Sequence, residues 1–226
     1  VHRQRRLDDP LLTFDVFRSR IFSGGVLAAS GAMFAVAGLE LLTTQRFQLV
    51  AGYSPLEAGL IVVAVTVAAF PFSLLGGASL HRAGFAPLIS GGFLAVAAGV
   101  GTAAWAGGHD ALPLFIAALA LVGAGAGAIM SVSSTAIIGS APIRRAGMAA
   151  GVEAVSYEFG TLLSVAVLGS LLPLFYARYA GGDMLTGLNG AAYLTILLII
   201  SALAAVFAAV TGWCFRDNPK GAHAPE

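Results

Sequence analysis

The chain has 226 residues, of which 58% are hydrophobic and only 10% are charged, and its formal net charge is +1. A soluble domain carries about 25% charged residues, so this composition excludes a soluble enzyme and a disordered chain. The near-neutral charge also argues against nucleic-acid binding, which needs a basic surface. The composition therefore predicts a protein that crosses a membrane.

Six apolar stretches are long enough to cross a bilayer as helices, which takes about 20 residues each. In chain order they are residues 21–45, 58–80, 87–108, 112–140, 148–177 and 191–215, joined by short connections with turn residues. Residues 1–20 precede the bundle, and within them residues 10–17 predict a short interfacial helix or a linker. Residues 216–226 form a tail. The predicted fold is an all-α bundle of six transmembrane helices.

Basic residues predict the orientation of this bundle. Ten of the 12 Lys and Arg residues lie before the first span, in the second or fourth loop, or in the tail, whereas Arg46 and Arg178 lie on the other side. Because cytoplasmic loops collect Lys and Arg, both termini are expected in the cytoplasm. The predicted location is the plasma membrane, which is the inner membrane of a bacterium, crossed several times and surrounded by its lipids.

Two carboxyl groups lie inside the fifth span. A charged group is costly in these apolar surroundings, so an acidic residue here usually marks an ion or substrate path. Glu158 lies about 15 Å into the span, near the midplane, and Glu153 lies about 7–8 Å in. Glu153 shares a stripe with Ser156 and Tyr157, which predicts a polar strip lining a cavity. Because burial disfavours the anion, a proton and a cation can compete for such a group. The alternative is a protonated Glu that bonds a neighbouring helix and has no role in transport.

Glu40 lies near the outer end of the first span, where a substrate role competes with that of an interfacial acid. We identify no basic residue within a span, so a cationic substrate is expected to supply the missing charge. Aromatic faces at Tyr157, Phe34 and Phe70 are candidates to bind it, with packing or lipid contact as the alternative. No His lies within a span, so no intramembrane protease motif exists and no metal site is expected.

Small residues recur at spacings that favour close helix contact in membranes. Gly123 and Gly127 form one such pair, and Gly147 and Gly151 form another. Packing is the expected role of both pairs. Pro71 and Pro173 lie inside spans, where each is expected to kink its helix.

The order of several motifs makes the sequence resemble a known family. GYSPLEAGL stands at residues 52–60, RAGMAAG at 145–151 and VAVLGS at 165–170. With GLELL at 38–42 and EAVSYEFG at 153–160, they resemble the C-terminal six-helix half of the major facilitator superfamily. The closest likeness is to its 14-helix drug:proton antiporters, in the methyl-viologen-resistance branch. Arg82 and Gly84 match the gating loop of that family, whereas His81 and Ala86 depart from it.

This resemblance implies two inverted three-helix repeats and part of a proton-coupled exporter of lipophilic or quaternary ammonium cations. The implied protein is no enzyme and uses the proton gradient rather than a cofactor. Glu158 and Glu153 would couple protons, while Glu40 and the three aromatic residues would bind the cationic drug. The missing N-terminal half or a partner subunit would complete the transporter, so the chain alone is expected not to transport.

Two alternatives remain open from the sequence. A non-transporting scaffold, or an inert truncated remnant of a transporter, would explain the missing half. A carrier of sugars or organic anions is less favoured, because an anion carrier is expected to place Arg or Lys inside its spans.

Overall fold

The computed structural model describes residues 14–109, 111–179, 181 and 184–216. Six helices in this part are long and apolar enough to cross a membrane, which confirms the predicted spans. They are α1 (Arg20–Leu49), α2 (Pro55–Ala83), α3 (Phe85–Gly108), α4 (Leu112–Gly139), α5 (Ala146–Tyr179) and α7 (Ala191–Phe215). Three shorter helices accompany them: η2 (Phe14–Arg18), η3 (Ile143–Arg145) and α6 (Met184–Asn189).

The two ends of the chain coincide only in part with the predicted segments. The 3-10 helix η2 stands where the sequence predicts an interfacial helix over residues 10–17, of which 10–13 lie outside the described residues. The predicted tail lies outside them too, apart from Arg216. The first span is longer than expected: α1 runs on to Leu49 and therefore includes Arg46.

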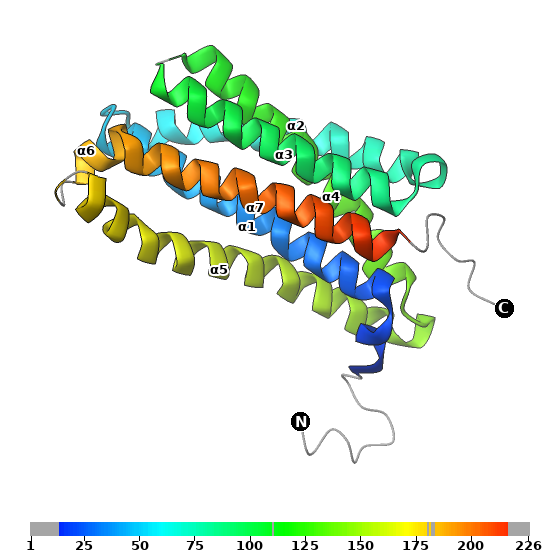
Figure 1. Ribbon diagram of the computed structural model, residues 1–226. Coiled ribbons are helices and arrows are strands. Elements are labelled where there is room, and N and C mark those ends of the chain that lie inside the picture. Colours follow the sequence, from blue (N-terminus) through cyan, green and yellow to red (C-terminus); the bar gives the residue numbers. More distant parts are fainter. Residues whose placement is uncertain (1–13, 110, 180, 182–183, 217–226) are drawn as a thin grey trace.

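The six long helices form two groups of three that pack crosswise. The middle helix of each group packs on the first helix of the other group, so α2 lies on α4 and α5 lies on α1. The last helices of the groups, α3 and α7, pack on each other. In Figure 1, α5 runs along one edge of the bundle and α2 and α3 along the other, with α1 and α7 between them. This exchange of partners is what an inverted repeat of three helices predicts.

Glycines allow the closest of these contacts. A Cβ atom on Gly127 would lie 2.9 Å from the Cα of Ala69, and one on Gly123 would lie 2.9 Å from the Cα of Val65. Only hydrogen at these positions lets the backbones of α2 and α4 meet. Gly147 and Gly151, by contrast, have nothing within 4 Å of their added Cβ atoms, so in this structure the second predicted packing pair touches no other helix.

The connections on either side of α2 have local causes. The Ser54 N–H donates to a Glu57 carboxylate oxygen at 2.8 Å and the Glu57 N–H donates to Ser54 Oγ at 3.3 Å, a capping box that starts α2. Pro55 follows at the first helical position, where its lack of an N–H does no harm. Gly84 ends α2 with φ at 81°, a conformation that favours glycine, so α3 begins one residue later.

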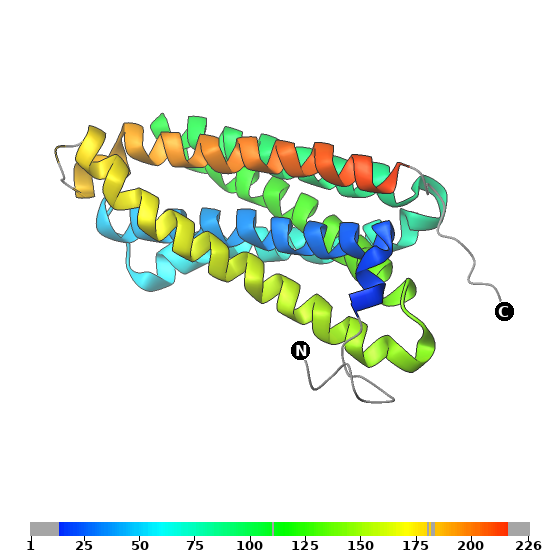
Figure 2. The same cartoon turned by 60° about the horizontal axis from the view of Figure 1, so that its bottom comes forward.

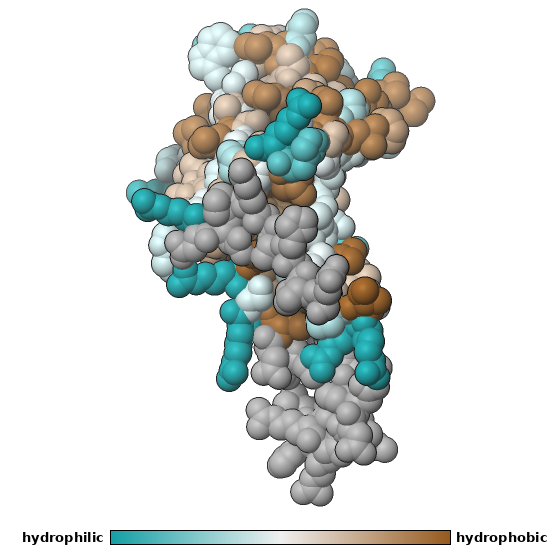
Figure 3. Space-filling view, turned by 90° about the vertical axis from the view of Figure 1, so that its right-hand side faces the viewer, coloured by the Kyte–Doolittle hydropathy of each residue, from teal (hydrophilic) through white to brown (hydrophobic). Residues whose placement is uncertain are grey.

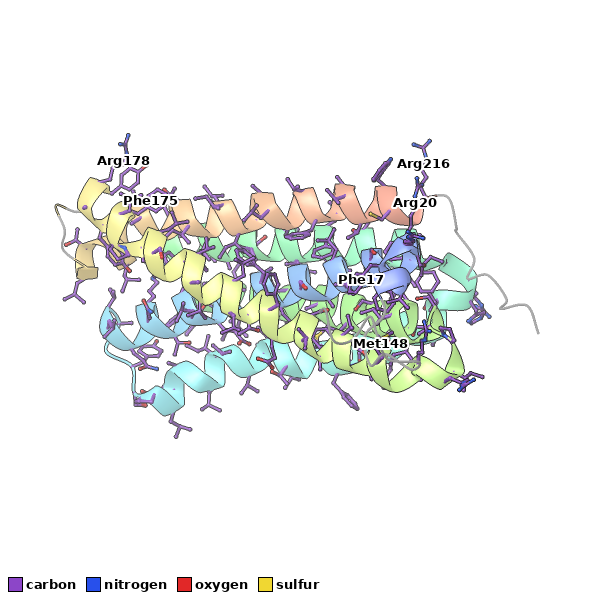
Figure 4. The ribbon with its side chains drawn as sticks, turned by 90° about the horizontal axis from the view of Figure 1, so that it is seen from below. Phe17, Arg20, Met148, Phe175, Arg178 and Arg216 are labelled. Carbon is purple, nitrogen blue, oxygen red and sulfur yellow. The ribbon has the colours of Figure 1, made fainter. Side chains whose placement is uncertain are left out.

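The described chain begins and ends at the same end of the bundle (Figures 1 and 2). That end also carries the α2–α3 and α4–α5 connections, so most basic side chains of the described part gather there. Figure 3 faces this end and shows hydrophilic side chains spread across it. In Figure 4, Arg20 and Arg216 lie at this end and Arg178 lies at the opposite one. The grouping of charges predicted from the sequence is therefore present in the fold.

Candidate functional site

The polar strip on α5 joins two helices instead of lining a cavity. Ser156 and Ser164 are buried, and Gly160 lies against the Ser30 carbonyl group of α1. Ser30 Oγ donates to the Ser156 carbonyl at 2.9 Å, and Ser164 Oγ donates to the Phe34 carbonyl at 2.8 Å. The strip differs from the expectation because its small polar side chains bond to backbone carbonyls across the α1–α5 contact, where water is excluded.

At the edge of this strip, Glu153 and Tyr157 form a side-chain pair. Tyr157 Oη lies 2.9 Å from Glu153 Oε1 and 3.4 Å from the Met130 carbonyl oxygen of α4. Both side chains of the pair are half-buried. A phenol has one proton to donate, so Tyr157 can serve either acceptor, the carboxylate on its own helix or the carbonyl on α4. The pair therefore bridges α5 and α4, two helices that otherwise touch sparingly.

No cationic side chain pairs with Glu153 in the described part of the chain. Its hydrogen bond to a neutral phenol leaves a full negative charge when the carboxyl group ionises. Such a group can hold a proton or face a cation, but not both. The proton-coupling role of Glu153 stays a prediction.

Glu158 lies elsewhere on α5. It is exposed and follows Ser156 by two residues, which is about 200° around the helix, so it faces away from α1. No hydrogen bond or ion pair holds Glu158 within the described residues. The structure thus does not bring Glu153 and Glu158 together, because a spacing of five residues places them about 140° apart around the helix.

The predicted substrate residues are dispersed. Glu40 is half-buried on α1, where the Thr44 hydroxyl donates to its backbone carbonyl, and its carboxyl group has no hydrogen bond within the described residues. Counted from helix starts at the same end of the bundle, Glu40 and Glu153 differ in depth by about 20 Å. Phe34 is buried, with 6% of its surface exposed, so its ring is not available to a ligand here. Phe70 on α2 is 69% exposed.

The two candidate gating residues stand at the α2–α3 connection. Arg82 is exposed in the last turn of α2. Gly84 is buried, and its N–H donates to the Leu80 carbonyl at 2.8 Å, which closes the helix. Gly84 thus has a structural role in the turn, while Arg82 is free to meet a charge outside the described residues. No three His, Cys, Asp or Glu side chains gather into a metal site within the described residues.

Sequence reasoning missed Arg46, which it placed in an outer loop while expecting no basic residue within a span. Arg46 lies in the last turn of α1 and is buried. Its Nη2 donates to the Gly107 carbonyl of α3, and its guanidinium lies 4.6 Å from the centroid of the Tyr193 ring. The signal for a longer helix was present, because apolar residues continue through Phe47, Leu49 and Val50.

Comparison with known proteins adds the ancestry. Residues 19–226 match the family model of the Major Facilitator Superfamily. The chain is 31% identical over 172 residues to the methyl viologen resistance protein SmvA of Salmonella typhimurium, covering 76% of this chain and 35% of that protein. It is 30% identical over 180 residues to the multidrug efflux pump LfrA of Mycolicibacterium smegmatis, covering 78% of this chain and 35% of that pump.

A third relative is the multidrug resistance protein Stp of Mycobacterium tuberculosis, 30% identical over 169 residues, which are 75% of this chain and 31% of Stp. The chain thus spans about a third of the length of each relative. The match to the family covers nearly every described residue and agrees with the six-span bundle and the motifs of the sequence. The chain is a multi-pass membrane protein that belongs to the Major Facilitator Superfamily, a family of transporters rather than enzymes.

Proposed function

We infer that the chain is part of a proton-coupled exporter that expels lipophilic or quaternary ammonium cations across the plasma membrane. The observation that carries this inference is the half-buried Glu153, bonded to Tyr157 and without a cationic partner in the described chain. A carboxyl group in this setting releases its proton when a cation arrives and recovers it when the cation leaves. The names of the relatives, a methyl viologen resistance protein and multidrug efflux proteins, support this class of substrate.

The remaining candidates have roles that depend on a further part of the transporter. Glu158 is exposed on α5, and Phe70 is exposed on α2. In an apolar stretch of 18 residues within each helix, the buried share is only 17% for α2 and 28% for α5, compared with 61% for α1. Because the chain spans about a third of each relative, we assign part of these uncovered faces to a second half or a partner subunit. That half would enclose Glu158 together with the drug. Glu40, which lies nearer the end of the bundle that carries Arg178, would attract the cation.

The orientation belongs to the same inference. The end that carries Arg82 and Arg216 faces the cytoplasm, because short cytoplasmic loops are rich in Lys and Arg. Single cysteines at the exposed Ile143 and at Tyr179, in a Cys214→Ser background, test this. A membrane-impermeant maleimide applied to intact cells is expected to label Tyr179→Cys and to spare Ile143→Cys. The reverse pattern contradicts the orientation.

The decisive experiment uses the complete reading frame that contains these residues, expressed in cells loaded with ethidium or methyl viologen. We expect efflux that a protonophore abolishes, and we expect Glu153→Gln or Glu158→Gln to reduce it to the level of cells without the protein. Glu57→Gln is the matched control, since Gln also completes a capping box and the site lies at a helix start. Efflux that stays proton-coupled in either variant removes that acid from the mechanism. No efflux from the complete protein favours a scaffold or a remnant.

A further inference from the structure

Among the described residues, one charged side chain inside the bundle has no opposite charge beside it. Arg46 is 9% exposed, and no carboxylate pairs with it in the described part of the chain. The nearest acid along α1 is Glu40, which lies six residues, or about 9 Å of helix, away. Arginine stays protonated at any physiological pH. A buried charge without a partner is costly, so the surroundings of Arg46 call for an anion.

The neighbouring acceptors use only part of the hydrogen-bonding capacity of the Arg46 guanidinium. A guanidinium has five N–H donors, and the Gly107 carbonyl accepts one of them. That carbonyl lies at the end of α3, where the helix dipole supplies about half a negative charge. Thr43 Oγ1 and Tyr193 Oη are buried beside the guanidinium and are acceptors without charge. Within the described residues, therefore, only acceptors without a formal charge surround the guanidinium.

An open cavity of about 350 Å³ adjoins the guanidinium. Its walls come from the end of α1, the α1–α2 connection and the neighbouring ends of α3 and α4, which lie together in Figure 1. One wall is aromatic: the Phe47 ring lies 5.3 Å from that of Tyr53 and 5.4 Å from that of Phe115, centroid to centroid. None of the described lining residues is acidic. The cavity thus offers a cation at one side and an apolar surface at the other.

The position of Arg46 along α1 sets its depth in the bilayer. At about 1.5 Å per residue the 30 residues of α1 extend about 45 Å, more than the hydrocarbon thickness of about 30 Å. Arg46 is three residues, or about 4.5 Å, from the end of the helix. Its guanidinium therefore lies at the level of the lipid headgroups, where phosphate groups are abundant.

We propose that this cavity binds the phosphate group of a membrane phospholipid, with Arg46 as the anion-binding residue. The guanidinium fork donates to two phosphate oxygens, which is the geometry in which Arg holds oxyanions most firmly. The glycerol and the upper acyl carbons lie along the aromatic wall. A Cβ on Gly107 would overlap Arg46 Nη1, so a side chain at this position would displace the guanidinium. The site lies at the opposite end of the bundle from Glu153 and is independent of the exporter chemistry.

The test measures binding to the purified 226-residue chain in an uncharged detergent, by titration calorimetry. Three ligands separate the sources of the interaction: dioctanoyl-phosphatidylglycerol, inorganic phosphate, and dioctanoylglycerol, which lacks the phosphate. We expect the phospholipid to bind, inorganic phosphate to bind more weakly and dioctanoylglycerol not to bind. Arg46→Gln is expected to weaken phospholipid binding at least about tenfold, the effect of losing one charge-assisted hydrogen bond. Arg178→Gln is the control, because Arg178 is exposed at the same end.

Further variants keep the test valid if Arg46→Gln fails to fold, as judged by circular dichroism. Arg46→Lys keeps the charge but loses the fork, and Gly107→Ala displaces the guanidinium from a different helix. Both are expected to weaken phospholipid binding while the chain stays helical. Equal affinity in wild type and the Arg46 and Gly107 variants overturns the proposal, as does the absence of phospholipid binding. Inorganic phosphate binding as tightly as the phospholipid overturns the lipid as ligand and leaves a free anion in its place.

Discussion

Replacing Gly127 by alanine tests the closest helix contact in the bundle. The added Cβ would lie 2.9 Å from both the carbonyl carbon and the Cα of Ala69 on α2, and these atoms belong to backbone that cannot rotate away. The helices must separate, and overpacking of this kind costs about 1–3 kcal/mol. Gly151→Ala provides the matched control, because its Cβ meets nothing within 4 Å.

The comparison of the two variants isolates the contact. Both gain the same preference of Ala over Gly in a helix, about 1 kcal/mol, so this contribution cancels in their difference. The free energy of unfolding is measured by titrating mixed micelles with SDS and following the fluorescence of Trp105 and Trp213. We expect Gly127→Ala to be about 1–3 kcal/mol less stable than Gly151→Ala. Equal stability of the two variants refutes the backbone contact between α2 and α4.

Three further predictions concern hydrogen bonds. Ser164→Ala removes the 2.8 Å hydrogen bond to a carbonyl of α1 and is expected to lower the free energy of unfolding by about 0.6–1.7 kcal/mol in the same SDS titration. Ser170→Ala loses only a hydrogen bond within α5 and is expected to have a smaller effect. Ser54→Ala removes the helix cap of α2 and is expected to cost about 1 kcal/mol, and no loss of stability would contradict the capping role. Tyr157→Phe and Glu153→Gln are expected to lower the free energy of unfolding less than additively when combined, because they disrupt one hydrogen bond, with a coupling of about 0.5–3 kcal/mol in the same titration. Additive losses would show that the two side chains act separately.

The sequence was sufficient for the topology of the bundle. The six spans agree with the helices to within a few residues at each end, because length, apolar composition and turn residues such as Gly84 decide where a helix crosses and stops. The gathering of Arg82, Arg144 and Arg216 at one end followed from the alternation of the spans. The family was also accessible, since motifs such as GYSPLEAGL are specific in order and composition.

The rotation of each helix about its axis was less accessible. Gly123–Gly127 and Gly147–Gly151 have the same spacing, yet only the first pair touches another helix. In a soluble helix the apolar stripe marks the inward face, but these helices are apolar on all sides, and lipid and protein core are equally apolar neighbours. For the same reason, the strip containing Ser156 predicted a cavity although it forms a helix contact.

Arg46 was missed for a different reason. A charged residue near the end of an apolar run indicates the border of a span. Arg46 is buried instead because it contacts the carbonyl at the end of α3 and the Tyr193 ring. Neither neighbour is close to Arg46 in the sequence. The burial of Arg46 can therefore be recognised only from a structure that shows which helix ends are neighbours.

The exchange of partners between the two groups of helices bears on how the protein is made. Among α1, α2 and α3, contacts are sparse, whereas α2 and α3 both pack extensively on α4. When α1, α2 and α3 have left the ribosome and α4 has not, each of the three is stable as a single span but has few contacts that hold it beside the other two. Arrival of α4 gives α2 and α3 a shared surface, and α5 and α7 then enclose α1. Tertiary assembly of these six helices thus waits until α4 has been synthesised.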